Sequence, residues 1–91
     1  MRFEWDDAKA ESNLEKHGVS FEEASQIWED PNLMVLSAKR IGEKRKLAIG
    51  RSYSVIFSVI HTERGDAVRI ISARRATQKE RTTYERGQDR H

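Results

Sequence analysis

The sequence predicts a single α+β domain in which the helices lie apart from an antiparallel sheet. Apolar side chains recur at helical spacing over residues 6–30 and then alternate along the chain over residues 45–73. A length of 91 residues is that of one domain, so we assign residues 1–91 to it. We expect a short N-terminal strand, two helices, a sheet of three or four antiparallel strands and a C-terminal helix.

The first elements are predicted from alternation and from capping residues. Residues 2–5 alternate polar and aromatic side chains, as a short strand does. Asp6 can cap a helix that ends before Gly18, since glycine readily takes the left-handed conformation at a helix C-terminus. A second helix begins at the capping box of residues 20–23 and ends at Pro31. The side chains expected on the shared faces of these helices are Ala10, Leu14 and His17, then Phe21, Ala24, Ile27 and Trp28.

The second half of the chain predicts the sheet. The run 53–61 carries apolar groups on both faces, which is typical of a central strand. The capping box Thr77 to Glu80 opens a last helix that ends near Gly87. The expected strands are 33–36, 45–49, 53–61 and 68–73, with a polar loop at 37–44 and turns at 50–52 and 63–66.

Charge is distributed unevenly along the chain. Residues 1–36 carry nine acidic and three basic groups, whereas residues 37–63 and 64–91 each have a net charge of +4. This asymmetry indicates a surface that binds a polyanion, although the two halves could instead neutralise each other in the fold. The chain has no cysteine, no apolar run long enough to span a membrane and no signal peptide at its start, so we expect a cytoplasmic protein.

Arginines gather where the last strand is expected to meet the last helix. Arg74 and Arg75 lie at this junction, where guanidinium groups and the free amides of a helix N-terminus can bind a phosphate. The plainer interpretation is a solvated basic rim, or arginines paired with the acidic N-terminal helices. We assign Trp5 and Trp28 to the core, and His17 to the C-terminus of the first helix, where a cation favours the helix dipole.

The same region has the groups needed to cleave RNA. Attack by the ribose 2′-hydroxyl needs a base, an acid and cations that stabilise the phosphorane, but no metal. The candidate proton-transfer groups are His61, Glu63 and Tyr84, and the candidate charge stabilisers are Arg45, Arg64, Arg74 and Arg75. The expected RNA contacts are Lys44, Lys46, Arg69, Lys79 and Arg81. No His, Asp or Glu residues have convincing metal-ligand spacing, so we expect neither a metal nor a cofactor.

Four short motifs, in two regions of this chain, resemble the two signatures of a known family. The motifs FEWD (3–6) and KHGVSFEEA (16–24), with Lys9 and Asn13 between them, resemble the opening signature of BrnT toxins. The motifs HTERG (61–65) and RIISARRA (69–76) resemble the family's second signature. The resemblance covers roughly residues 3–86, and two separate signatures in the right order make it specific.

The resemblance implies the toxin half of a bacterial type II toxin–antitoxin module, with a fold similar to RelE-type ribonucleases. It implies RNA cleavage that arrests translation, neutralised by a BrnA-like antitoxin with a ribbon-helix-helix domain, so that DNA is contacted only through the antitoxin. In RelE-like toxins, arginines on the sheet and often a tyrosine on the C-terminal helix serve the RNA; Arg45, Arg64, Arg74, Arg75 and Tyr84 occupy comparable places. The alternatives are a non-catalytic module that binds RNA or DNA through the same basic face, and a structural domain that docks an acidic partner.

Overall fold

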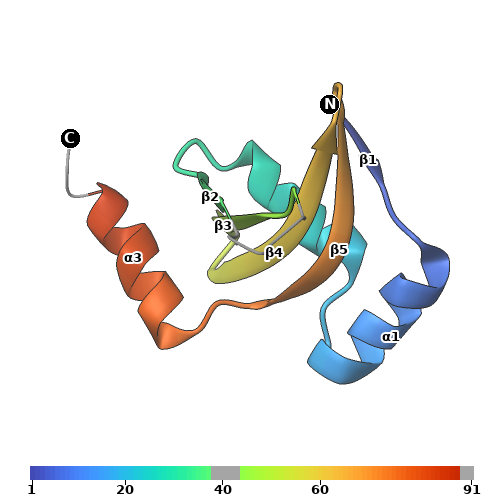
Figure 1. Cartoon of the computed structure of the whole chain (residues 1–91). Helices are drawn as coiled ribbons and strands as arrows, with labels where there is room; N and C mark the ends of the chain where they lie inside the picture. Colours follow the sequence, from blue (N-terminus) through green and yellow to red (C-terminus); the bar gives the residue numbers. More distant parts are fainter. Residues whose placement is uncertain (38–43, 89–91) are drawn as a thin grey trace.

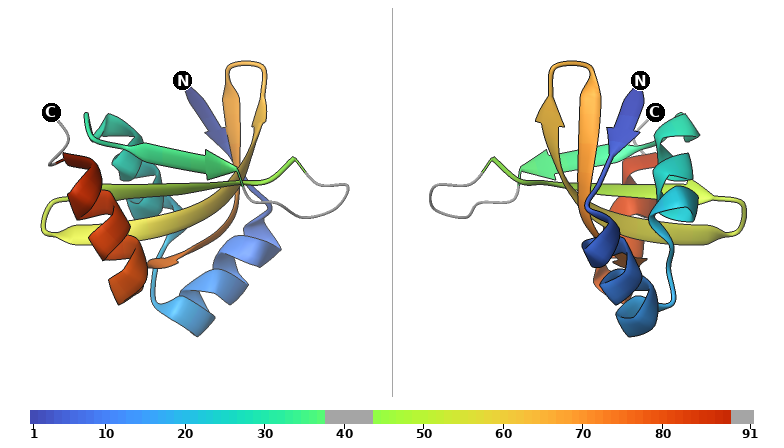
Figure 2. Two further views of the ribbon diagram at one scale, coloured as in Figure 1. Left: turned by 60° about the vertical axis from the view of Figure 1, so that its left-hand side comes forward. Right: turned by 90° about the vertical axis from the view of Figure 1, so that its right-hand side faces the viewer.

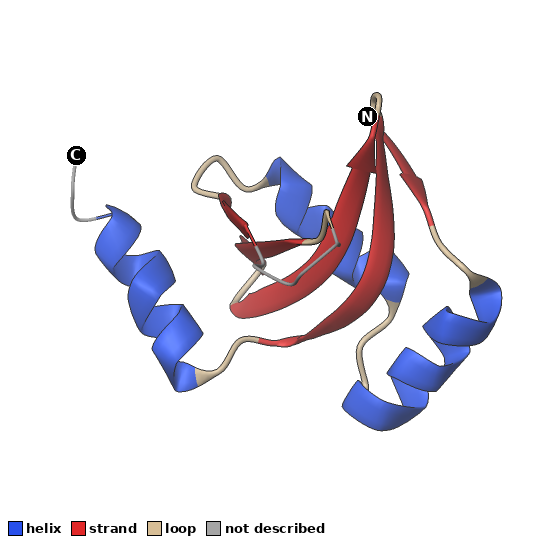
Figure 3. Cartoon of the chain, viewed as in Figure 1, coloured by secondary structure: helices blue, strands red, loops and turns tan. Residues whose placement is uncertain are grey.

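The α+β class predicted from the sequence is confirmed by the structure. A computed structural model of the chain describes residues 1–37 and 44–88, so most of the loop expected at 37–44 lies outside the described residues. The helices are α1 (Asp7–His17), α2 (Phe21–Ser25), the 3₁₀ helix η1 (Gln26–Glu29) and α3 (Gln78–Gln88) (Figure 1). The strands are β1 (Arg2–Glu4), β2 (Met34–Ser37), β3 (Lys46–Ser52), β4 (Val55–Arg64) and β5 (Ala67–Arg75) (Figure 3).

The sheet differs from the expected one in strand number and direction. It has five strands in the order β1-β5-β4-β3-β2, and β1 pairs in parallel with β5, with Phe3 opposite Val68. The expected sheet of four antiparallel strands is confirmed in β2–β5, and β1 joins it as a fifth strand whose parallel pairing was not predicted. The cause is a pairing between two segments that lie far apart in the sequence, which no local pattern of residues reveals.

The β3–β4 hairpin turns later than expected. We expected a turn at 50–52, but β3 continues through Gly50 to Ser52 and the turn is formed by Tyr53 and Ser54. A Cβ on Gly50 would come within 2.9 Å of Cβ of Ile27, so this glycine permits η1 to approach the sheet and does not mark a turn. Tyr53, expected inside a strand, instead has a left-handed backbone with φ of 55° and is exposed.

Each face of the sheet carries its own apolar core. On one face, α2 and η1 pack on the three central strands, and α3 packs on the other face against β3 and β4. The first core consists of Val19, Phe21, Ala24, Ile27, Ala48, Phe57, Val59, Val68, Ile70 and Ala73, and Trp5 and Trp28 pack against it as expected. The second core consists of Ile49, Ile56, Ala76 and Tyr84. We call these the η1 face and the α3 face of the sheet.

Helix α1 is attached to the sheet by a polar side chain. Leu14, expected on the buried face, is 51% exposed, and Asn13 is buried in its place. Nδ2 of Asn13 donates to the carbonyl of Ala73 at 2.8 Å, and Oδ1 accepts from the amide of Ala73 at 3.0 Å. Asn13 thus takes the place of a neighbouring strand along the part of β5 that β1 does not cover, and both views of Figure 2 show α1 beside this part of β5. The spacing of apolar residues does not reveal that the backbone groups of Ala73 need hydrogen-bond partners.

Candidate active site and basic surfaces

The two faces of the sheet divide the predicted site residues into separate groups. Neighbouring residues of a strand point to opposite faces. On β4, the ring of His61 packs at 5.0 Å against that of Trp28, so His61 and Glu63 belong to the η1 face. Thr62 and Arg64 therefore lie on the α3 face.

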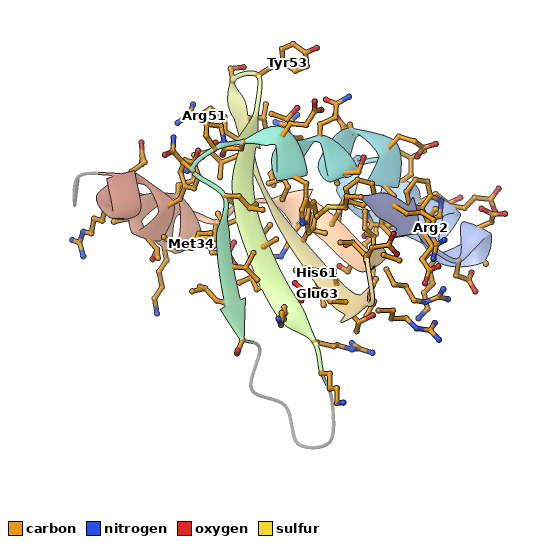
Figure 4. The ribbon with its side chains drawn as sticks, turned by 90° about the horizontal axis from the view of Figure 1, so that it is seen from above. Arg2, Met34, Arg51, Tyr53, His61 and Glu63 are labelled. Atoms are coloured by element: carbon orange, nitrogen blue, oxygen red, sulfur yellow. The ribbon has the colours of Figure 1, made fainter. Side chains whose placement is uncertain are left out.

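Lys46, His61 and Glu63 form a cluster on the η1 face. Lys46 lies directly opposite His61 in the β3–β4 ladder. Its ammonium donates to Oε1 of Glu63 at 2.9 Å, and Oε2 of Glu63 lies 3.6 Å from Nε2 of His61. The side chains of Lys46 and Glu63 are 40% and 45% exposed, whereas that of His61 is fully buried. Figure 4 shows His61 and Glu63 beside one another, at the other end of the hairpin from Tyr53.

The protonation states of this cluster follow from its contacts. The hydrogen bond from Lys46 lowers the pKa of Glu63, so its carboxylate is ionised at neutral pH. Burial lowers the pKa of His61, so its imidazole is neutral. Among the described residues, Nε2 of His61 has no hydrogen-bond partner. The cluster therefore consists of an accessible pair, the Glu63 carboxylate and the Lys46 ammonium, packed against the buried neutral ring of His61.

Two arginines, Arg64 and Arg69, lie on the α3 face. Arg64 and Arg69 approach one carboxylate oxygen of Glu4 at 3.7 and 4.0 Å. These distances exceed those of hydrogen bonds, and exposed pairs of this kind contribute little to stability. The two guanidinium groups are therefore available to an anionic ligand at this edge of the sheet.

An anion-binding position exists at the junction of β5 and α3, and a carboxylate of the chain occupies it. Arg74 donates to both oxygens of Glu80, at 2.6 and 2.9 Å. Oε1 of Glu80 also accepts from the Thr77 amide at 2.9 Å and from the Ser58 hydroxyl at 2.8 Å. These donors, Arg74 first, lower the pKa of Glu80 to about 2. A phosphate could reach this position only by displacing Glu80, whereas Arg75 beside it is exposed.

Tyr84 lies beneath α3, in the second core. It is 1% exposed, and its hydroxyl donates to Asp30 at 2.5 Å. The guanidinium of Arg51 lies 5.8 Å from the centre of its ring. Burial, followed by the hydrogen bond to Asp30, raises the pKa of Tyr84. Tyr84 and the Lys46–Glu63 pair therefore lie on opposite faces of the sheet.

The structure brings three predicted site residues into contact, namely Lys46, His61 and Glu63. It places Arg64 and Arg69 together on the other face of the sheet, beside Glu4. Exposed residues elsewhere are Lys44 before β3, and Lys79 and Arg81 on α3; Arg45 is half-buried. The prediction that Lys46 contacts RNA does not include its pairing with Glu63. The bonds of Asp30 and Asn13 were not predicted either, since neither residue lies in a pattern that indicates a distant partner.

The described part of the chain has neither a metal-binding cluster nor a membrane-spanning helix. Over residues 1–37 and 44–88, no group of three or more His, Cys, Asp or Glu side chains is arranged to hold a metal ion. Over the same ranges, none of the helices has the length and apolar character needed to cross a membrane.

Comparison with known proteins identifies the family. The family model of the ribonuclease toxin BrnT, of type II toxin–antitoxin systems, matches residues 5–80. The chain therefore belongs to the BrnT family of ribonuclease toxins, which confirms the resemblance seen in its motifs. A toxin of this type has RNA as its substrate and an antitoxin as its partner. No curated protein matches the chain.

Proposed function

We propose that this toxin cleaves RNA without a metal ion, by attack of a ribose 2′-hydroxyl, with Glu63 and Lys46 at the reacting centre. The observation that carries the proposal is the hydrogen-bonded pair itself, an ionised carboxylate and an ammonium group 2.9 Å apart, both accessible to a ligand. In this scheme a base accepts the proton and an adjacent cation stabilises the developing phosphorane charge.

The reaction proceeds in one displacement. Glu63 removes the proton of the 2′-hydroxyl as its oxygen forms a bond to phosphorus and the bond from phosphorus to the 5′-oxygen breaks. Lys46 donates a hydrogen bond to a phosphorane oxygen and supplies a proton to the leaving 5′-oxygen. The products are a 2′,3′-cyclic phosphate and a 5′-hydroxyl.

His61 is a positioning residue in this scheme. Its side chain is fully buried, so it does not meet the substrate, but its Nε2 lies 3.6 Å from Glu63. The neutral imidazole packs beneath the carboxylate without a hydrogen bond to it, and the hydrogen bond from Lys46 holds the carboxylate in place.

The arginines supply positive charge that holds the RNA backbone outside the reacting centre. Arg64 follows Glu63 along β4 but lies on the α3 face, where it is 67% exposed. Arg45 and Arg75 are assigned the same role, and Arg74 can serve only after release from Glu80. We assign Tyr84 to fastening α3, because its hydroxyl is already bonded to Asp30.

The cleavage test uses purified protein and single-stranded RNA in EDTA. Wild type should give fragments with cyclic phosphate ends, and Glu63→Gln and Lys46→Gln should each reduce the rate by about 10²-fold or more. Glu85→Gln, on the exposed surface of α3, is the matched control. Full activity of Glu63→Gln would contradict the assignment of the base, and RNA bound but never cleaved would indicate a non-catalytic binding module.

We further propose that cleavage arrests translation in the cytoplasm and that a BrnA-like antitoxin with a ribbon-helix-helix domain neutralises it. The family assignment supports an antitoxin in general. Induced expression should stop growth, and co-expression of a neighbouring gene that encodes a ribbon-helix-helix protein should restore it. Growth arrest that no such neighbour relieves would contradict this part of the proposal.

A further inference from the structure

A groove with basic walls lies between α1 and the middle of β5, away from the Lys46–Glu63 pair. Its volume is about 180 Å³, or roughly six water molecules at ~30 Å³ each, which is room for a phosphodiester group. The lining residues are Lys9, Ser12, Asn13, Lys16, His17, Ile71 and Ser72. Ile71 is the one apolar side chain among them, so the groove is suited to a polar ligand.

The charges of α1 are sorted between the groove and the opposite side of the helix. Lys9 and Lys16 are two of the three basic groups in residues 1–36, where nine groups are acidic. At about 100° per residue, Lys9 and Lys16 point within ~20° of each other. Glu11 and Glu15 point ~160° and ~120° away from Lys9 on the same scale. In this acidic segment, both lysines of α1 are therefore directed to one groove.

The hydrogen-bonding groups of the groove are available to a ligand. Within residues 1–37 and 44–88, neither ammonium of Lys9 and Lys16 forms an ion pair, and the hydroxyls of Ser12 and Ser72 make no hydrogen bond. Asn13 differs, since its amide is fully occupied by the backbone of Ala73 and Val19. Asn13 thus builds the floor, while the lysines and serines supply donors.

A bulge in β5 joins the groove to the α3 face of the sheet. Ile60 of β4 pairs with Ser72 and His61 pairs with Ile70, so Ile71 is an extra residue without a partner on β4. Ser72 lies on the face that also carries Arg69. A polyanion bound at Arg69 can therefore continue past Ser72 into the groove.

We propose that this groove is an RNA-binding subsite that holds a backbone phosphate at a distance from the bond that is cleaved. Lys9 and Lys16 neutralise its charge, and the hydroxyls of Ser12 and Ser72 with the ring of His17 donate to its oxygens. RNA is favoured over an acidic protein segment because Ile71 is the one apolar side chain among the lining residues, whereas protein interfaces depend on a cluster of large anchoring side chains. The inference rests on the proposed function, since it assumes that RNA is the ligand of the same chain.

The test measures binding of a single-stranded RNA whose riboses are all 2′-O-methylated, which prevents 2′-hydroxyl attack. The variant is Lys9→Gln with Lys16→Gln in the full chain, and the matched control is Glu11→Gln with Glu15→Gln on the other side of α1. The lysine variant should bind roughly tenfold more weakly at low salt, and its plot of log affinity against log salt should be less steep by about 0.7 for each phosphate that the variant no longer binds. With cleavable RNA, KM should rise while kcat is unchanged.

The inference would be overturned if the lysine variant bound RNA with unchanged affinity and salt slope. It would also be overturned if the variant bound the antitoxin more weakly while its affinity for RNA stayed the same. If the double variant does not fold, Ser12→Ala with Lys16→Gln provides the same measurement. Failure of the proposed function is distinct, because wild type would then leave unmodified RNA intact. Failure of the inference alone would leave wild-type cleavage in place.

Discussion

The hydroxyl of Tyr84 donates a hydrogen bond of 2.5 Å to a carboxylate oxygen of Asp30, across 54 positions of sequence. The same oxygen accepts from the amide of Arg51 at 2.8 Å. One carboxylate thus fastens the end of η1 to β3 and to α3. The predicted proton-transfer role of Tyr84 competes with this structural one, and the two can be distinguished.

Tyr84→Phe should lower the free energy of unfolding by about 1–3 kcal/mol, because Asp30 loses a donor at a partly buried site. RNA cleavage by the folded variant should be unchanged. Urea unfolding and initial cleavage rates measure the two effects separately. If the free energy of unfolding is unchanged and the cleavage rate falls strongly, Tyr84 takes part in the reaction.

Glu80 should make stability depend on pH in the acid range. Its pKa of about 2 in the folded state lies below the ordinary value of 4.5. The stabilisation is therefore fully present above pH 4.5 and is lost as pH falls toward 2. We expect a contribution of roughly 2 kcal/mol, since Arg74 is partly exposed to solvent. Unfolding of Glu80→Gln and Glu85→Gln across this range is the measurement, and only Glu80→Gln should flatten the profile.

His61 should make stability depend on pH in a higher range. Burial lowers its pKa below 6.5, so the unfolded chain takes up the proton first. Stability should therefore decrease as pH falls through 6.5 and level off below the folded pKa of His61. His61→Phe keeps an aromatic ring against Trp28 and should remove this dependence, whereas His17→Gln should retain it. Equal profiles for wild type and His61→Phe would disprove the assignment.

Tyr53→Asn should raise the free energy of unfolding by roughly 0.5–1 kcal/mol, since asparagine tolerates a left-handed backbone better than tyrosine does. Tyr53 is 90% exposed, so its ring contributes little packing. Thermal unfolding checks the gain, with Ser54→Asn as the control at the other turn position. A destabilised Tyr53→Asn would show that the ring has a contact of its own that matters.

The helix caps and the alternation of β4 could be predicted, because they depend on neighbouring residues, whereas the change from α2 to the 3₁₀ helix η1 and the bulge in β5 could not. Asp6, Ser20 and Thr77 cap the helices as expected. The parallel pairing of β1 and the burial of Asn13 could not be predicted, because both are set by segments far away in the sequence.

The wrong predicted position of the β3–β4 turn explains why the pairing of Lys46 with Glu63 was not predicted. A turn centred on Arg51 would place Lys46 opposite Ile56, whereas the observed turn places it opposite His61. Register is set by turn position, and a small shift changes every cross-strand neighbour. Glu63 and His61 could thus be identified by residue type. Their contact with Lys46 depends on the strand register, which was predicted wrongly because Gly50 was assigned to the turn.

The parallel pairing of β1 with β5 also determines when the molecule can be completed during its own synthesis. Residues 2–4 are made before the rest of the sheet, yet their partners 67–69 lie in β5, the last of its strands to be made. Phe3 of β1 packs on Trp28, which in turn packs on His61. The layer that supports the cluster therefore closes only after the final hairpin emerges, because folding during synthesis cannot form a contact whose second half does not yet exist. The toxin's site is therefore complete only once the ribosome has made β5, after every other strand of the sheet.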